Sequence, residues 1–89
     1  MIVKELIINA ENGFEAKPAT LFIQKASKYK SSIWVEKGER KANGKSLLGL
    51  MSLGLANGQR ITIIADGDDE EQAIQDLYKY LMAEASVKE

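Results

Sequence analysis

The chain has 89 residues and a formal net charge of −1 at pH 7, and 45% of its residues are hydrophobic and 28% charged. This length predicts one small domain spanning residues 1–89, and the composition excludes disordered and collagen-like chains. The sequence contains neither cysteine nor histidine. Their absence excludes disulfide scaffolds, iron–sulfur clusters, Ser-His-Asp catalysis and nearly every zinc site. We therefore expect no metal and no cofactor.

Charge is distributed unevenly along the chain. Residues 17–45 carry a balance of +6, whereas residues 66–89 carry a balance of −6. The asymmetry either steers a charged partner or reflects two solvated faces of one domain. An isoelectric point near 5.5 argues against direct binding of nucleic acid. Apolar stretches fall short of the about 20 residues that a membrane span needs, and the N-terminus lacks a signal-peptide pattern. We expect a cytoplasmic protein without a membrane partner.

The first half of the chain predicts a strand, a helix and a second pair of strands. An apolar run from Ile2 to Ile8 predicts a strand, which Asn12-Gly13 ends. From Ala16 the apolar residues follow helical spacing, and this helix is expected to end at Ser31-Ser32. Two strands follow, over residues 33–37 and 40–42, joined by a tight turn.

The second half predicts a short apolar helix, a strand and a final helix. Ser46 is placed as the N-cap of a helix over residues 47–53, which Gly54 stops. A β-branched run over residues 60–65 predicts a strand, and Asp68 and Glu71 at capping-box spacing open the last helix. The order β-α-β-β-α-β-α predicts an α+β open-faced sandwich, with a four-stranded antiparallel sheet and three helices on one face.

Two short motifs suggest functions that the surrounding residues do not support. Gly44-Lys45-Ser46 matches the end of a phosphate-binding loop, but Glu39 stands where that loop needs its first glycine. The acidic residues between positions 66 and 71 lack the ligand spacing of a calcium loop. Acidic side chains at the start of a helix complement its dipole, which explains them without a metal ion.

Two segments together resemble the HPr family of phosphocarrier proteins of the sugar phosphotransferase system. Residues 12–20, Asn-Gly-Phe-Glu-Ala-Lys-Pro-Ala-Thr, match the family's Gly-x-His-Ala-Arg-Pro-Ala-Thr active-site motif. Residues 45–54, Lys-Ser-Leu-Leu-Gly-Leu-Met-Ser-Leu-Gly, match the family's Lys-Ser-x-x-Gly-x-Met-Ser-Leu region, which carries a regulatory serine. The resemblance extends over essentially the whole chain and implies the same β-α-β-β-α-β-α fold.

The first motif departs from the family at the residue that carries phosphate. Glu15 occupies the position of the phosphorylated histidine, and Lys17 occupies that of the partner arginine. Reversible phosphotransfer needs an imidazole nitrogen, and no histidine exists elsewhere in the chain. The resemblance therefore implies a regulatory protein of the histidine-lacking Crh type rather than a phosphocarrier or an enzyme. Glu15 adds a negative charge at neutral pH, and whether that charge supports or opposes partner binding is left open.

The second motif is intact and implies a regulatory switch. By resemblance, Ser46 is the target of HPr kinase/phosphorylase, and the phosphoprotein is a corepressor that binds a CcpA-type LacI-family repressor in carbon catabolite repression. The residues that the resemblance places against partners are Lys17, Thr20, Gln24, Lys45, Leu47, Leu48 and Met51. From the residues alone, without the resemblance, the N-cap role is the preferred explanation of Ser46. The alternative function is a divergent HPr-like domain that regulates other metabolic enzymes by direct binding, and a weak homodimer is a further expected assembly.

Overall fold

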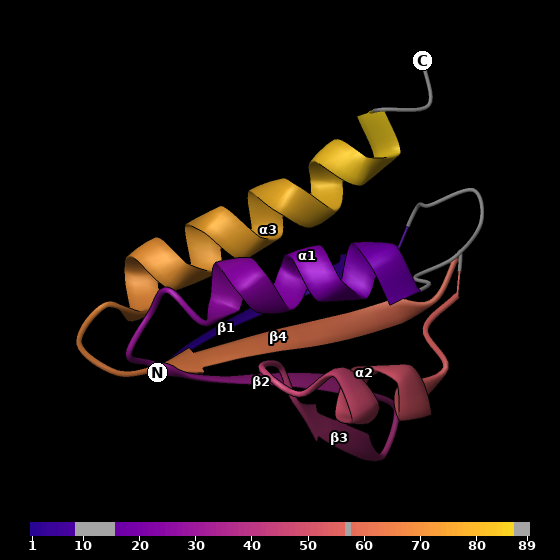
Figure 1. The fold of residues 1–89 in the computed structure, drawn as a ribbon, viewed down its shortest axis with the longest axis horizontal. Coiled ribbons are helices and arrows are strands. Elements are labelled where there is room, and N and C mark those ends of the chain that lie inside the picture. Colours follow the sequence, from indigo (N-terminus) through magenta and orange to yellow (C-terminus); the bar gives the residue numbers. More distant parts are fainter. Residues whose placement is uncertain (9–15, 57, 87–89) are drawn as a thin grey trace.

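The computed structural model describes residues 1–8, 16–56 and 58–86, which form four strands and three helices (Figure 1). The element order is that predicted from the sequence. The bounds are β1 (Ile2–Ile7), α1 (Ala16–Ala26), β2 (Ser32–Lys37), β3 (Arg40–Asn43), α2 (Leu47–Leu53), β4 (Arg60–Asp66) and α3 (Glu70–Ser86). The predicted break at Asn12-Gly13 and the residue Glu15 lie outside the described residues.

The four strands form one antiparallel sheet in the order β1-β4-β2-β3. The central strand β4 alternates in burial, with Ile61, Ile63 and Ala65 directed into the core. Because side chains alternate across a strand, the residues between them face the opposite side of the sheet. There Ile64 lies opposite Trp34 of β2, and Lys41 Nζ is 4.8 Å from the centroid of the Trp34 ring. The sheet thus has a packed face and an open face, as predicted.

The helices cover the packed face of the sheet. Helices α1 and α3 lie side by side across the strands, and α2 packs against α1 and β3 (Figure 1). Each helix contributes fully buried apolar side chains, among them Phe22 of α1, Leu50 of α2 and Leu77 of α3. Ala73, Ile74, Leu77 and Leu81, which follow helical spacing in α3, are all buried. The fold class predicted from the sequence is confirmed.

Helix α1 ends earlier than the sequence predicted. It stops at Ala26, and residues 27–31 form a separate turn before β2 begins at Ser32. The amide N–H groups of Lys28 and Tyr29 donate to carbonyl oxygens only three residues back. Such tight bonds close the last turn of a helix rather than continue it. The predicted end at Ser31-Ser32 was therefore wrong by about one helical turn.

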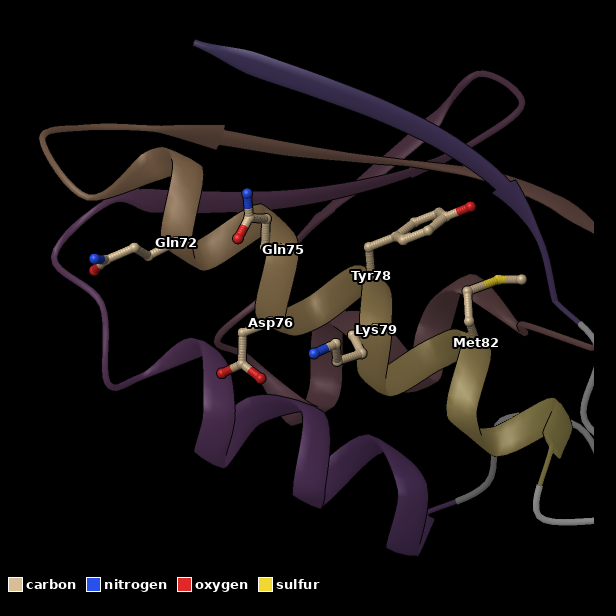
Figure 2. A pocket seen from close by; sticks show the side chains of 6 residues that line it. All are labelled: Gln72, Gln75, Asp76, Tyr78, Lys79 and Met82. Atoms are coloured by element: carbon tan, nitrogen blue, oxygen red, sulfur yellow. The ribbon is translucent and has the colours of Figure 1, made fainter.

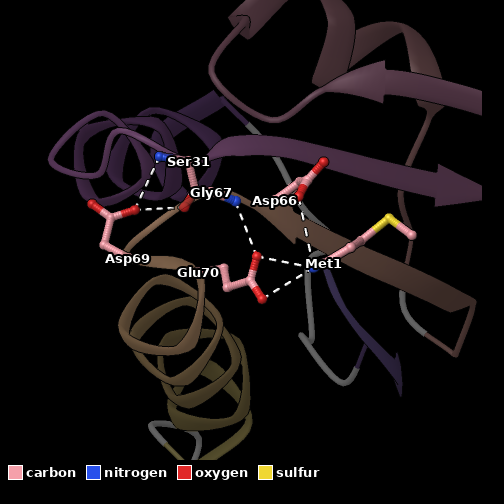
Figure 3. Close-up of polar contacts among 6 residues, drawn as sticks. All are labelled: Met1, Ser31, Asp66, Gly67, Asp69 and Glu70. Carbon is pink, nitrogen blue, oxygen red and sulfur yellow. Dashed lines mark hydrogen bonds and ion pairs between the residues drawn. The ribbon is translucent and has the colours of Figure 1, made fainter.

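The predicted capping box at the start of α3 is also wrong. Glu70, not Glu71, reaches back, and its carboxylate accepts the Gly67 N–H at 3.0 Å (Figure 3). This bond, together with the N-terminal ammonium of Met1, lowers the pKa of Glu70. Asp69 is used elsewhere, because it accepts from the main-chain N–H and the hydroxyl group of Ser31 (Figure 3). A short acidic run offers several capping registers, and only the packing of the 27–31 turn selects one.

Candidate phosphorylation site and partner surface

Ser46 caps the N-terminus of α2, as the sequence predicted. Its backbone is extended, with φ −117° and ψ 118°, and its Oγ accepts the Gly49 N–H at 3.1 Å. The Ser46 carbonyl oxygen accepts the Leu50 N–H at 3.0 Å, which starts the helix. A side-chain acceptor at this position satisfies an N–H group that has no partner within the helix. The hydroxyl oxygen of Ser46 thus has a defined position beside the first turn of α2.

The other end of α2 is closed by Gly54 and by a lysine from the sheet. Gly54 has φ +65°, a left-handed conformation that suits glycine, and its N–H donates to the Met51 carbonyl at 3.2 Å. Lys37 Nζ donates to the Gly54 carbonyl at 3.1 Å. A cation here also complements the negative end of the helix dipole. Helix α2 is therefore capped at both ends, although it has only seven residues.

Two glycines hold α2 close to the sheet. A Cβ on Gly44 would lie 2.6 Å from Ile33 Cγ2, and the Gly44 N–H donates to the Ile33 carbonyl at 2.7 Å. A Cβ on Gly49 would lie 3.3 Å from the Cβ of Ala42 in β3. Neither glycine has a positive φ angle. Close packing, rather than backbone conformation, explains these residues.

An exposed apolar surface follows Ser46 along α2. Leu47, Leu48 and Met51 are 43%, 84% and 45% exposed, and we call these three residues the α2 patch. The same helix buries Leu50 and Leu53 against the core. Because the buried residues already anchor the helix, the α2 patch is available for a partner. All three residues of the α2 patch were predicted from the sequence as partner contacts.

Lys45 has a contact that the sequence did not indicate. Its Nζ donates to the Tyr29 carbonyl oxygen at 2.7 Å, and its main-chain N–H donates to Asn43 Oδ1 at 2.8 Å. Tyr29 in turn donates its hydroxyl to Asp76 Oδ2 of α3 at 2.8 Å. This hydrogen bond, with burial and the nearby negative charge, raises the pKa of Tyr29. No periodic pattern links positions 29, 45 and 76, so only the fold reveals this connection.

Helix α1 carries the other predicted partner residues. Thr20 and Gln24 are exposed on α1, which packs beside α2. Lys17 lies in the first turn of α1, and its side chain is outside the described part of the structure, as is Glu15. Leu21, which the sequence did not single out, is 39% exposed on the same helix. A leucine outside the buried spacing of Ala19, Phe22 and Ala26 was the available signal.

Other surface features lie apart from these residues. A shallow groove on α3 is lined by Gln72, Gln75, Asp76, Tyr78, Lys79 and Met82 (Figure 2), none of which was predicted as a site residue. Within residues 1–8, 16–56 and 58–86, no three acidic side chains are grouped to hold a metal ion. No helix in the described residues is long and apolar enough to cross a membrane.

Comparison with known proteins identifies the family to which this fold belongs. Residues 2–83 match the family model described as the PTS HPr component phosphorylation site. The chain is 39% identical over 84 residues to the HPr-like protein Crh of Halalkalibacterium halodurans, covering 94% of this chain and 100% of that protein. The chain therefore belongs to the HPr family.

Solved structures agree with this assignment. The crystal structure of HPr-C-His from Thermoanaerobacter tengcongensis matches with a TM-score of 0.92 and 43% identity over 97% of each chain. The crystal structure of Crh from Bacillus subtilis matches with a TM-score of 0.76 and 38% identity, covering 94% of this chain and 97% of that one. That Crh structure is described as a dimer with a swapped domain. The chain is thus similar both to phosphocarriers and to their Crh-type relatives.

Proposed function

We propose that this protein is a Crh-type regulator of carbon catabolite repression, consisting of one HPr-like domain over residues 1–89. HPr kinase/phosphorylase phosphorylates Ser46, and the phosphoprotein then binds a CcpA-type LacI-family repressor as its corepressor. The protein acts in the cytoplasm, has no enzymatic activity of its own and needs no cofactor. It contacts neither nucleic acid nor membrane directly.

The observation that carries this proposal is the geometry of Ser46. Its hydroxyl oxygen is held at the start of α2, directly before the exposed α2 patch. Similarity to Crh of H. halodurans over nearly the whole chain supports a regulatory rather than a transport role. Glu15 supports it further, because a carboxylate stands where the family motif carries its phosphorylated histidine.

The switch follows from charge. A phosphoserine carries a charge of about −2 at neutral pH and three strong acceptor oxygens. At Ser46 the negative charge would lie beside the N–H groups of the first turn of α2, where the helix dipole favours an anion. The fold would change little, because α2 is already capped and packed. Phosphorylation thus adds an anionic anchor next to apolar surface, a combination that suits a partner with basic and apolar side chains.

Thr20 and Gln24 of α1, with Lys17 in its first turn, extend this surface in the proposal. Helix α1 packs beside α2, so one partner can cover residues of both helices. Lys45, the residue directly before Ser46, is the last member of this proposed partner surface. The protein also forms a weak homodimer in this proposal. The domain-swapped dimer of Crh from B. subtilis supports this part.

Incubation with HPr kinase/phosphorylase and ATP, followed by intact-mass measurement, tests the first step. We expect the addition of one phosphate to the parent and none to Ser46→Ala, with Ser52→Ala as the matched control that is still modified. Ser52 is exposed on the same helix, and its Oγ donates to the Gly49 carbonyl at 2.8 Å. Loss of the Ser46 cap costs about 0.5–2 kcal/mol, so the variant is expected to remain folded.

Titration against the repressor tests the second step. The phosphorylated parent should bind and enhance operator binding, whereas unphosphorylated protein and Ser46→Ala should not. Equal enhancement by Ser46→Ala would show that the switch is misplaced. Phosphorylation without repressor binding would instead favour the alternative, an HPr-like domain that regulates other metabolic enzymes by direct contact.

A further inference from the structure

The ammonium group of Lys45 is adjacent in sequence to Ser46 but is bound elsewhere. Its Nζ donates to the main-chain carbonyl oxygen of Tyr29 at 2.7 Å, in a part-buried position. That carbonyl belongs to the turn over residues 27–31, which joins α1 to β2. A full positive charge is thus held by a neutral acceptor next to the candidate phosphoacceptor.

The 27–31 turn is attached to the rest of the protein through both α3 and the start of α2. From α3, Asp76 accepts the Tyr29 hydroxyl at 2.8 Å. At the start of α3, Asp69 accepts the Lys30 N–H at 2.8 Å and both the N–H and the hydroxyl of Ser31. On the α2 side, the side-chain contact described for this turn is the bond from Lys45.

We propose that phosphorylation of Ser46 moves the Lys45 ammonium from the Tyr29 carbonyl to the phosphate and so breaks the side-chain bond between the 27–31 turn and the segment before α2. This inference rests on the proposed phosphorylation of Ser46. The bond from Lys45 to the Tyr29 carbonyl has one ionised partner, whereas a phosphate of about −2 charge would add a direct attraction between opposite charges. Neighbouring Cα atoms lie only about 3.8 Å apart, and lysine carries its charge on a flexible four-carbon stem. The phosphate is therefore within reach of Nζ and outcompetes a carbonyl oxygen.

The consequence is a second segment that reports the phosphorylation state. The turn stays attached to α3 through Asp69 and Asp76, so the sheet and the core remain unchanged. It carries Lys28 and Lys30, both exposed. A partner that touches α2 and this turn meets a new anion at Ser46 and, at the same time, a less restrained basic segment. Both changes distinguish the phosphorylated from the unphosphorylated protein.

Nuclear magnetic resonance of isotope-labelled protein tests the transfer of Lys45. Phosphoserine is placed genetically at position 46, so the sample does not depend on the kinase. We expect the ¹³C resonance of the Tyr29 carbonyl to move toward the value of a carbonyl without a charged donor. Amide exchange at Lys28 and Tyr29 should become several-fold faster, because these N–H groups belong to the released turn. An unchanged Tyr29 carbonyl resonance would overturn the proposal.

Two lysine variants separate this effect from a general response to the new charge. Unphosphorylated Lys45→Met should already show the shifted Tyr29 carbonyl resonance, and phosphoserine should add no further change there. Lys37→Met removes the lysine at the opposite end of α2 and should leave the response of the parent intact. An equal response in Lys45→Met and the parent would refute the role of Lys45. Failure of the kinase to modify Ser46 would refute the proposed function alone, since the phosphoserine protein still decides this inference.

Discussion

Truncation of Leu48 to alanine should weaken partner binding while leaving the fold intact. Leu48 is 84% exposed in the free protein, so nearly all of its side chain is still available for burial. Complete burial of a leucine side chain is worth about 1.5–3 kcal/mol, and alanine retains part of that surface. If the repressor covers Leu48, the variant should lose about 1–2 kcal/mol of binding free energy, or roughly 5- to 30-fold in affinity. Titration of the Ser46-phosphorylated variant and parent against the repressor measures this difference.

Folding stability must be measured in parallel, because an unfolded variant would also fail to bind. Urea unfolding should place Leu48→Ala within about 0.5 kcal/mol of the parent, as is usual for an exposed position. Leu50→Ala is the matched control on the same helix, and its leucine is 1% exposed. That change should cost about 2–5 kcal/mol of stability. Parent-like affinity in a folded, phosphorylated Leu48→Ala protein would refute the assignment of the α2 patch as partner surface.

Further predictions concern Glu15, Gly67 and Asp69. Phosphoenolpyruvate and enzyme I should leave the protein unlabelled, and transfer of label to Glu15 would contradict its regulatory assignment. Phosphorylated Glu15→Gln, titrated against the repressor at two salt concentrations, should bind more weakly than the phosphorylated parent. If the variant instead binds more tightly, and its advantage over the parent shrinks at high salt, the charge of Glu15 opposes the complex. Gly67→Ala should lower stability by about 1–3 kcal/mol in urea unfolding, because its Cβ would lie 2.7 Å from Ser31 Cα, and unchanged stability would disprove this close packing. The Ser31 hydroxyl and the Lys30 N–H lower the pKa of Asp69, so its contribution to stability is present above the ordinary aspartate pKa and is lost as pH falls through the lowered value. Asp69→Asn should therefore be less stable than the parent at neutral pH but not in strong acid, and an equal difference at both would argue against the carboxylate.

Hydrophobic spacing was sufficient to predict the element order and most of the core. Ile61 and Ile63 alternate with less buried residues in β4, and the apolar residues of α3 follow helical spacing. Each pattern reflects burial of one face of the element and can be recognised in the sequence itself. Ser46 as an N-cap followed from local chemistry alone, because its acceptor bond spans three residues. Local signals of this kind need no knowledge of the fold.

Most of the features that were missed depend on contacts between distant parts of the chain. The capping box was placed at Asp68 and Glu71, and the sequence did not indicate that Asp69 binds Ser31, which lies 38 residues away. The early end of α1 has the same origin, since Asp69 and Asp76 fix the turn that follows it. The bond from Lys45 to the carbonyl oxygen of Tyr29, 16 residues away, was likewise not predicted. Long polar side chains find their partners only once the packing is known.

The close fit of Gly44 and Gly49 against the sheet makes the geometry of Ser46 a property of the folded protein. An isolated seven-residue helix is unstable in water, because nucleation is costly and too few bonds follow it. Ser46 therefore has its capped geometry only while Ile33 and Ala42 support α2 from β2 and β3. A kinase that reads this geometry acts on a three-dimensional epitope and passes over unfolded or newly made chains that contain the same residues. Under the proposed function, only folded molecules would then be phosphorylated, and an unfolded chain would carry no signal to a partner.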